Sequence, residues 1–524
     1  MSNDNILKIS KLYKNAVAKL TALNNEIDVA EPFTLTNECN EEVCGSGFFI
    51  TCTDIYLPRH FSHKRYLITN AHVIEGSSTK RISISFPHLG DTILYGEVIL
   101  ACKTLDFAIV EVTAEKNSHI EKELGKTFHQ VFKTIPFVKM CAKPFNTKSE
   151  LAKDVLAIGF PLASNDSHIS CGNVSGKHEH YLQVNGSINS GNSGGPLFNH
   201  KGEAIGICAA SFEESEGITL AIEWFHVSKM LKHYWDKKSL VIYPPGLGVS
   251  CKRLIDAYAI TKLKDENVKG CLISKVFPQS CFKKSLKDGD IIMSIGDDTN
   301  EFEVDRAGNV NVPYQNDKVK WFSLNVLMLL NPELCFVRVY SKNRRKTINF
   351  KLQTVENMVR YVMPSLETIP CFLFGGLVLT QLTRNHMEDV PDDVDPNVIS
   401  FFTKTQGSQE SVVISSYFIP CALVEQGYSI KKLSIVQKFN KKKVTNVEQM
   451  KELCLECMER YFQDPESKKA KFVELETNSS KYIMDLEEVV KTETLLRMTP
   501  SYPTQFSIVS IANHVNKKRK LSDR

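Results

Sequence analysis

The hexapeptide Gly191–Pro196 reads Gly-Asn-Ser-Gly-Gly-Pro and places one serine between glycines. Such a run predicts a tight turn that exposes and aims the Ser193 hydroxyl. On that turn the backbone N–H groups of Gly191 and Ser193 can point at one spot and stabilise a developing oxyanion. The residue types and their spacing therefore predict nucleophilic attack on a carbonyl group, although glycine-rich turns with a serine also occur as plain loops.

A serine nucleophile needs a general base and an acidic residue that orients this base. His72 follows the strand-like run Arg65–Ile68, and Asp106 stands at the head of the apolar run Phe107–Val110. A carboxylate in that place is costly to bury unless a group such as an imidazole N–H donates to it. Taken singly, His72 is typical of a structural histidine and Asp106 of a turn or cap residue. Taken together, the order His, Asp, Ser matches chymotrypsin-type serine proteases and predicts a catalytic triad.

The elements that must position this triad read as strands. From Val43 to about Thr219 the chain consists of short β-like runs divided by Gly, Pro, Asn and Asp, which is typical of an antiparallel barrel or sandwich. A short amphipathic helix is expected from Trp224 to about Trp235. The preceding run Leu7–Asn24 fits either a helix or a strand.

Two further units follow a break at Pro244-Pro245. The first has an apolar-Gly-apolar turn at Leu247–Val249 and a glycine turn before the strand-like run of residues 291–296. The second repeats a glycine turn before a strand near Gly375-Gly376 and contains a predicted helix at Val447–Tyr461. We predict domains at residues 1–240, 244–360 and 365–509, followed by a basic tail at 510–524.

Composition limits the classes of protein. The last fourteen residues carry five basic side chains and one acidic side chain, which accounts for the whole net charge of +4, so we expect no nucleic-acid-binding surface. The 15 cysteines have no disulfide-framework spacing, and the polar first residues lack the apolar core of a signal peptide. We therefore expect reduced thiols and a nuclear or cytosolic location, and the run Lys517–Lys520 resembles a nuclear import signal.

We expect no membrane span and no metal or organic cofactor. The apolar run Ile369–Leu379 is too short to cross a bilayer and reads as buried strands. The polar segment Ala163–Tyr181 holds three histidines and a cysteine, at positions 168, 171, 178 and 180, but their spacing fits no standard zinc pattern. We interpret this segment as a mobile regulatory loop.

Taken in chain order, the motifs resemble those of the Deg/HtrA serine proteases. The runs that carry the resemblance are residues 45–50 (Gly-Ser-Gly-Phe-Phe-Ile), 69–73 (Thr-Asn-Ala-His-Val), 105–110 (Leu-Asp-Phe-Ala-Ile-Val), 157–161 (Ala-Ile-Gly-Phe-Pro) and 188–196 (Ile-Asn-Ser-Gly-Asn-Ser-Gly-Gly-Pro). The second unit resembles a PDZ domain, in which Gly246, Leu247, Gly248 and Val249 would form the peptide-binding loop. The third unit is similar to the degenerate second PDZ domain of plant nucleolar-type Deg proteases.

The resemblance implies a mainly β fold, with a chymotrypsin-like double β-barrel protease domain followed by two PDZ-like α+β domains. It also implies ATP-independent proteolysis, protein or peptide substrates and trimer-based homo-oligomers. The specificity pocket would be lined by Ser187, Ala209 and Ala210. A neutral serine at position 187 argues against Arg or Lys at the cleavage site and favours small or medium apolar side chains.

Two other functions remain open at this stage. The chain could be a chaperone or peptide-binding scaffold whose protease unit is latent, which requires distorted loops because the motifs are intact. It could also be a dedicated processing protease with one substrate, a hypothesis that the two appended binding units disfavour.

Overall fold

The computed structural model describes residues 1–24, 28–33, 41–75, 81–186, 191–211, 218–243, 247–254, 263, 265, 267–277, 280–311, 318–320, 331, 333–352, 359–387, 394, 396–403, 412–427, 430–499 and 502–522. The chain divides into two compact units. The first unit contains residues 1–26 and 37–355, and the second contains residues 27–36 and 356–524.

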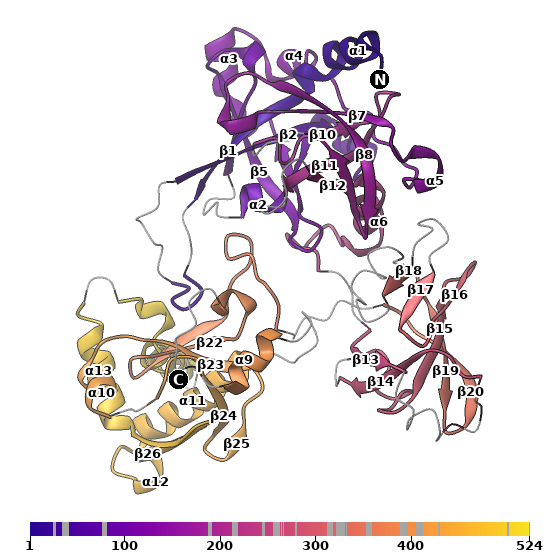
Figure 1. The fold of residues 1–524 in the computed structure, drawn as a ribbon. Coiled ribbons are helices and arrows are strands. Elements are labelled where there is room, and N and C mark those ends of the chain that lie inside the picture. The colour runs from indigo at the N-terminus through magenta and orange to yellow at the C-terminus, as the bar shows by residue number, and fades with distance from the viewer. Residues whose placement is uncertain are drawn as a thin grey trace. The chain divides into compact units, whose positions relative to one another are not determined.

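Two closed antiparallel barrels form the larger part of the first unit (Figure 1). The first barrel has the strand order β1-β2-β3-β6-β5-β4 and the second β10-β11-β12-β9-β8-β7. The strands of the first barrel are β1 (Val17–Asn24), β2 (Glu41–Ile50), β3 (Arg65–Thr69), β4 (Arg81–Ser85), β5 (Ile93–Cys102) and β6 (Phe107–Val112). Those of the second are β7 (Asp154–Gly159), β8 (His168–His178), β9 (Tyr181–Asn185), β10 (Pro196–Phe198), β11 (Ala204–Ser211) and β12 (Ile218–Glu223).

Short helices cover these barrels and are α1 (Asn3–Tyr13), α2 (Ala71–Ile74), α3 (His119–Leu124), α4 (Phe128–Phe132), α5 (Thr147–Glu150) and α6 (Trp224–Tyr234). The sequence left Leu7–Asn24 open between helix and strand. The structure contains both, because α1 ends at Tyr13 and β1 begins at Val17. The predicted helix from Trp224 is α6.

One apolar core joins the two barrels. Alternate residues of a strand point to opposite faces, so Leu156 and Ile158 of β7 pack between the barrels while Val155 and Ala157 fill the second barrel. Helix α6 adds Trp224 to the core between the barrels. Truncating such a buried aliphatic side chain to alanine costs about 2–5 kcal/mol, so this seam fixes the position of each barrel against the other.

The segment Ala163–Tyr181 is a correction to the sequence analysis. Most of it forms the long strand β8, which pairs with both β7 and β9. The side chains of β8 are mostly exposed or half-buried, so the sequence lacks the apolar alternation that predicts a strand.

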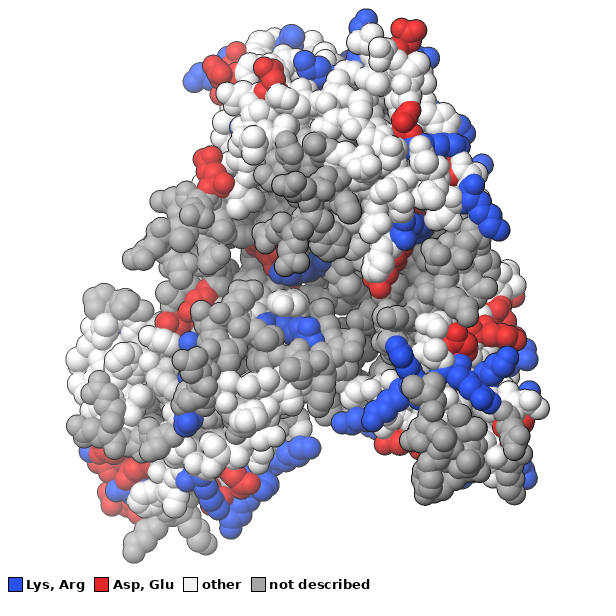
Figure 2. Space-filling model, viewed as in Figure 1, with Lys and Arg blue, Asp and Glu red and all other residues white. Residues whose placement is uncertain are grey.

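The remainder of the first unit is a sheet of order β13-β14-β15-β19-β20, with β16 paired to β15 and a separate β17-β18 pair. Its strands are β13 (Val249–Arg253), β14 (Cys271–Val276), β15 (Ile291–Gly296), β16 (Glu301–Glu303), β17 (Asn309–Asn311), β18 (Lys318–Lys320), β19 (Phe336–Ser341) and β20 (Arg344–Asn349). Acidic and basic side chains are interspersed over the face of the molecule in Figure 2.

The second unit, here called the C-terminal domain, has a sheet of order β21-β22-β23-β24-β26-β27, with β25 paired to β24. The strands are β21 (Cys371–Phe374), β22 (Leu377–Gln381), β23 (Val413–Phe418), β24 (Ser434–Phe439), β25 (Lys442–Lys443), β26 (Phe472–Thr477) and β27 (Lys481–Asp485). The helices are α9 (Pro396–Thr403), α10 (Ala422–Gly427), α11 (Val447–Gln463), α12 (Lys468–Lys471), α13 (Leu486–Leu496) and α14 (Ile508–Ser522).

Two expectations for the C-terminal domain can be compared with its elements. The predicted buried strands at Ile369–Leu379 are β21 and most of β22, joined by two glycines of positive φ. The predicted tail at 510–524 lies mostly inside α14, which starts at Ile508 and buries Ala512 in the core of this domain. No helix among the described residues combines the length and apolar character that crossing a membrane requires.

Candidate active site

His72 is the second residue of the short helix α2, which directly follows β3 and Asn70. Its ring Nδ1 lies 2.8 Å from Asp106 Oδ2, and its backbone N–H donates to Asp106 Oδ1 at 3.0 Å. An ionised carboxylate only accepts, so Nδ1 of the neutral ring carries the proton, and Nε2 is an acceptor with no partner among the described residues. The His72 side chain is 41% exposed, which leaves this acceptor accessible to a substrate.

Asp106 occupies the turn that leads into β6. Its φ is +47°, a left-handed conformation that Asp tolerates better than most residues, and its N–H donates to the Lys103 carbonyl at 3.2 Å. The Asn70 side-chain amide holds the Asp106 carbonyl at 2.8 Å. Asp106 is therefore both a turn residue and the partner of His72, and β3, α2 and β6 together fix the pair.

The charge of Asp106 prepares His72 to accept a proton. Burial lowers the pKa of His72, but the hydrogen bond to Asp106 and the charges of Asp106 and Glu75 outweigh it, so the pKa lies above its usual value of 6.5. An imidazole with a raised pKa is the stronger general base, because its protonated form is stabilised.

The nucleophile turn depends on its glycines. Gly191 has φ +94° and Gly194 has φ +88°, conformations that an L side chain rarely adopts. A Cβ at Gly191 would collide with the Phe160 carbonyl, and one at Gly194 with the Ser46 carbonyl. The N–H of Gly194 donates to the Cys208 carbonyl at 2.8 Å and so ties the turn to β11.

Ser46 of β2 holds this turn in place, a role that the sequence analysis did not assign. Its N–H donates to the Ser193 carbonyl at 2.7 Å, and its Oγ donates to the Gly191 carbonyl at 2.6 Å. The Phe160 N–H in turn donates to Ser46 Oγ at 2.9 Å. One residue of the first barrel thus orders the turn that precedes β10 of the second barrel.

Ser193 as a whole residue is more enclosed than the glycine-rich turn predicted. It is only 6% exposed, because the turn packs against β2. Within the described residues its hydroxyl makes no hydrogen bond, with His72 or with any other group, and the N–H groups of Gly191 and Ser193 find no acceptor. Without substrate, catalytic hydrogen bonds are often long and tighten only when substrate binds.

The other predicted site residues stay predictions. Ser187 and Gly246 lie outside the described residues, and Ala210 lies in β11 without a described side chain. Ala209 is buried in the core that joins the barrels. Leu247 is buried in the core of the sheet β13-β14-β15-β19-β20. Gly248, with φ +64°, directly precedes Val249 at the start of β13.

A second carboxylate–histidine pair lies in the second barrel, away from the nucleophile turn in sequence. Glu223 Oε2 forms an ion pair with Lys177 and lies 3.3 Å from His226 Nε2, and Glu223 Oε1 accepts the Phe145 N–H at 2.6 Å. Burial alone would raise the pKa of Glu223, but His226 and Lys177 outweigh this effect and lower the pKa to about 2. Burial also lowers the pKa of the neighbouring His180 to about 3, so that ring is neutral.

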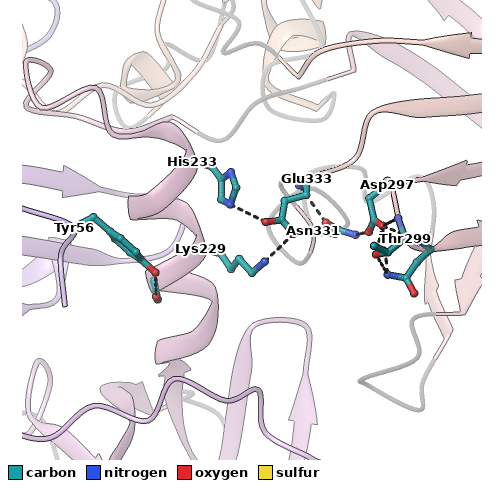
Figure 3. A network of polar contacts seen from close by, with 9 residues as sticks. Tyr56, Lys229, His233, Asp297, Thr299, Asn331 and Glu333 are labelled. Atoms are coloured by element: carbon teal, nitrogen blue, oxygen red, sulfur yellow. Dashed lines mark hydrogen bonds and ion pairs between the residues drawn. The ribbon is translucent and has the colours of Figure 1, made fainter. Parts of the chain in front are cut away.

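Helix α6 connects this pair with the sheet that follows the barrels. Figure 3 shows Lys229 and His233 of α6 directed at Glu333, with Nζ–Oε2 and Nε2–Oε1 distances of 2.9 and 3.1 Å. Beyond Glu333, the Asn331 amide donates to Asp297 Oδ2 at 2.7 Å. Among the described residues, no group of three or more His, Cys, Asp or Glu side chains is placed to hold a metal ion.

The two barrels, the His72–Asp106 pair and the Ser193 turn define a trypsin-like peptidase domain, and the trypsin-like peptidase domain family matches residues 45–207. The PDZ domain family matches residues 365–498, within the third unit of the sequence analysis. This combination of domains supports a protease of the Deg/HtrA type, the family that the motifs of the sequence resemble.

Curated relatives of the same type are similar to the chain at low identity. "Protease Do-like 2, chloroplastic" of Arabidopsis thaliana is 25% identical over 414 residues, which cover 75% of this chain and 62% of that protein. "Serine protease HtrA-like" of Staphylococcus aureus (strain NCTC 8325 / PS 47) is 25% identical over 312 residues, which cover 55% and 35%. The chain thus spans less than two thirds of the length of these relatives.

Solved structures of this type are also similar. The serine endoprotease from Yersinia pestis matches with a TM-score of 0.42 and 18% identity, over 68% of this chain and 99% of that chain. The HtrA-type protease AlgW with a tripeptide matches with a TM-score of 0.45 and 17% identity, over 67% and 97%.

Proposed function

We propose that this chain is an ATP-independent serine endopeptidase that cleaves unfolded or regulatory proteins. The observation that carries the proposal is the His72–Asp106 pair, in which both carboxylate oxygens of Asp106 contact His72. The same domain contains Ser193 on a turn between two glycines of positive φ. PDZ-mediated recognition of peptide segments would bring substrates to this site.

The proposed steps follow from the positions of these groups. Ser193 Oγ attacks the scissile carbonyl carbon while His72 Nε2 takes its proton, and the N–H groups of Gly191 and Ser193 bind the oxyanion. His72 then gives the proton to the leaving amine, and the acyl-enzyme forms. Water, activated by the same imidazole, hydrolyses the ester and restores Ser193. Asp106 keeps the proton on Nδ1 and stabilises the imidazolium throughout.

A second candidate function is a peptide-binding scaffold with a latent protease unit. It is favoured by Ser193, a residue that is only 6% exposed and whose hydroxyl has no hydrogen bond to His72 within the described residues. Labelling with a fluorophosphonate probe separates the two functions, since the probe reacts only with an activated serine. Labelling of the wild type that is lost in both Ser193→Ala and His72→Ala supports the endopeptidase. No labelling of any of these, even with added C-terminal peptides, supports the scaffold.

We further propose that the partners are protein or peptide substrates and that the chain assembles into trimer-based homo-oligomers in the nucleus or cytoplasm. The similarity to Deg/HtrA proteases supports the assembly, and the basic run Lys517–Lys520 supports the location. Sedimentation equilibrium of the purified chain tests the assembly, and a mass that is not a multiple of three chains contradicts it.

A further inference from the structure

A short segment of the protease domain belongs to a different part of the molecule. Asp28–Phe33 stands in the sequence between β1 and β2 of the first barrel. Residues 27–36 nevertheless form one compact unit with residues 356–524, the C-terminal domain. The domain is therefore completed by a segment that lies more than three hundred residues earlier in the chain.

Polar contacts seat the segment on β23. The buried Ser416 hydroxyl donates to the Ala30 carbonyl at 2.7 Å, and Ala30 is only 6% exposed. The segment is also shaped for this contact by its own turn, in which the Ala30 N–H donates to Asp28 Oδ1 at 2.7 Å and the Glu31 N–H to the Asp28 carbonyl at 3.1 Å. A preorganised turn loses less conformational entropy when it docks.

Apolar contacts complete the docking. The Phe33 ring lies 5.9 Å from the Phe506 ring, and both rings pack against a cluster of Leu373, Val378 and Tyr502. Leu373 and Val378 are on the opposite face of β21 and β22 from Phe372 and Leu379, which belong to the core under α11 and α14. The segment therefore covers part of the second face of the sheet, at β21 and β22.

The same segment precedes, by seven residues of sequence, the strand β2 that orders the nucleophile turn. β1 and β2 pair without interruption from Val17↔Phe48 to Asn24↔Glu41, and Lys19 faces Ser46 within this ladder. Ser46 in turn binds the Ser193 and Gly191 carbonyls. Restricting the motion of the connection between β1 and β2 therefore also restricts the β1–β2 ladder that positions Ser46.

We propose that Asp28–Phe33 is a built-in ligand of the C-terminal domain, and that this domain, by holding the segment, restrains the β1–β2 hairpin and thereby the Ser193 turn. The occupant is the segment of the same chain. The effect on the Ser193 turn gains its functional meaning from the proposed endopeptidase activity, but the docking itself does not depend on that activity.

The test uses full-length protein carrying Ser193→Ala, so that its result is independent of catalysis. In this background Phe33→Ala is compared with Ile483→Ala, which truncates a side chain of β27 that is 72% exposed. A fluorescent peptide with the sequence of residues 26–36 is added to each. We expect it to bind the Phe33→Ala protein, whose site is vacated, and to be excluded from the parent and from Ile483→Ala. Equal binding to all three proteins, or to none, overturns the proposal.

Hydrogen exchange of the same proteins provides the second readout. We expect amides of residues 28–33, β23 and β2 to exchange on the order of tenfold faster in Phe33→Ala, with β26 and β27 unchanged. Unchanged exchange in β23 overturns the docking, and unchanged exchange in β2 overturns the restraint of the hairpin. If β26 and β27 also exchange faster, Ser416→Ala replaces Phe33→Ala, and the same outcomes decide.

Discussion

The protease domain contains two carboxylate–imidazole pairs that differ in their surroundings. Asp106 and His72 are 2.8 Å apart, and their side chains are 21% and 41% exposed. Glu223 and His226 are 3.3 Å apart, and their side chains are 2% and 0% exposed. Among the described residues, Nε2 of His72 in the first pair has no partner, whereas the second pair is enclosed with Lys177 beside His180.

The comparison teaches that the chemistry of the pair does not determine its role. A catalytic base needs a solvent-accessible ring nitrogen and a nucleophile close to it. Of the two histidines, His72 is the one that is exposed enough to meet these requirements. A buried pair that is closed on all sides contributes to stability only while every partner is present. The two pairs should therefore respond to mutation in opposite ways.

The largest expected difference concerns the two histidines. His72→Ala should lower kcat on the order of 10⁶-fold because it removes the general base, and should leave the free energy of unfolding nearly unchanged. His226→Ala should lower the free energy of unfolding by about 2–5 kcal/mol and leave kcat per folded molecule within a few-fold. Casein hydrolysis and urea unfolding of both variants measure the two effects, and a loss of activity without a loss of stability in His226→Ala would refute the comparison.

The carboxylate of the exposed pair should have the next largest effect. Asp106→Asn should lower kcat about 10⁴-fold, because an amide no longer keeps the proton on Nδ1 of His72. Steady-state kinetics at neutral pH measure this loss. A decrease of less than tenfold would mean that Asp106 does not orient the base.

The carboxylate of the buried pair should affect stability instead. Glu223→Gln should lower the free energy of unfolding by about 3–5 kcal/mol, since it leaves Lys177 buried without a counter-charge. The folded pKa of Glu223, about 2, lies below its usual value of 4.5, so its contribution is present above pH 4.5 and is lost as the pH falls towards 2. Urea unfolding between pH 7 and pH 3 should show this slope in the wild type and a weaker slope in Glu223→Gln.

Replacing Ser46 should lower kcat by a smaller factor than replacing His72 or Asp106. Ser46→Ala removes the hydrogen bond to the Gly191 carbonyl of the nucleophile turn and the one from the Phe160 N–H, each worth roughly 0.5–1.5 kcal/mol, and should lower kcat on the order of tenfold to a hundredfold. Ser175→Ala, which removes an exposed hydroxyl of β8 and its 3.4 Å hydrogen bond to the Gln183 carbonyl, is the matched control and should leave kcat unchanged. Equal kcat values for the two variants would argue against a positioning role for Ser46.

The smallest effect is on the pH profile. His72 must be neutral to accept a proton, and its folded pKa is raised above 6.5, so kcat/KM should fall as the pH drops through a midpoint above 6.5. A pH series with a short fluorogenic peptide gives this midpoint. A midpoint below 6.5 would mean that Asp106 does not raise the basicity of His72.

The sequence predicted the exposed pair because its residues stand in short motifs with local signals. Thr69–Val73, Leu105–Val110 and the glycines around Ser193 each indicate a strand end or a turn, and the His, Asp, Ser order adds specificity. The apolar spacing from Trp224 likewise predicted α6. Signals of this kind depend on a few neighbouring residues, so they can be read from the sequence without knowledge of the fold.

The features that the sequence did not predict depend on distant contacts. Glu223 meets Lys177 from 46 residues away, and Ser416 meets Ala30 from 386 residues away. β8 was taken for a loop because its neighbours β7 and β9, and not apolar alternation, make it a strand. Ser46 stood in a recognised motif, but its role required the turn that it holds.

The most direct test of the central claim is the cleavage of unfolded casein by the purified full-length protein beside its Ser193→Ala variant. Casein loss in the wild type that disappears in Ser193→Ala is the predicted result, and it assigns the nucleophile. Equal casein loss in both proteins, or none in either even with added C-terminal peptides, would contradict the assignment of Ser193, His72 and Asp106 as a working triad.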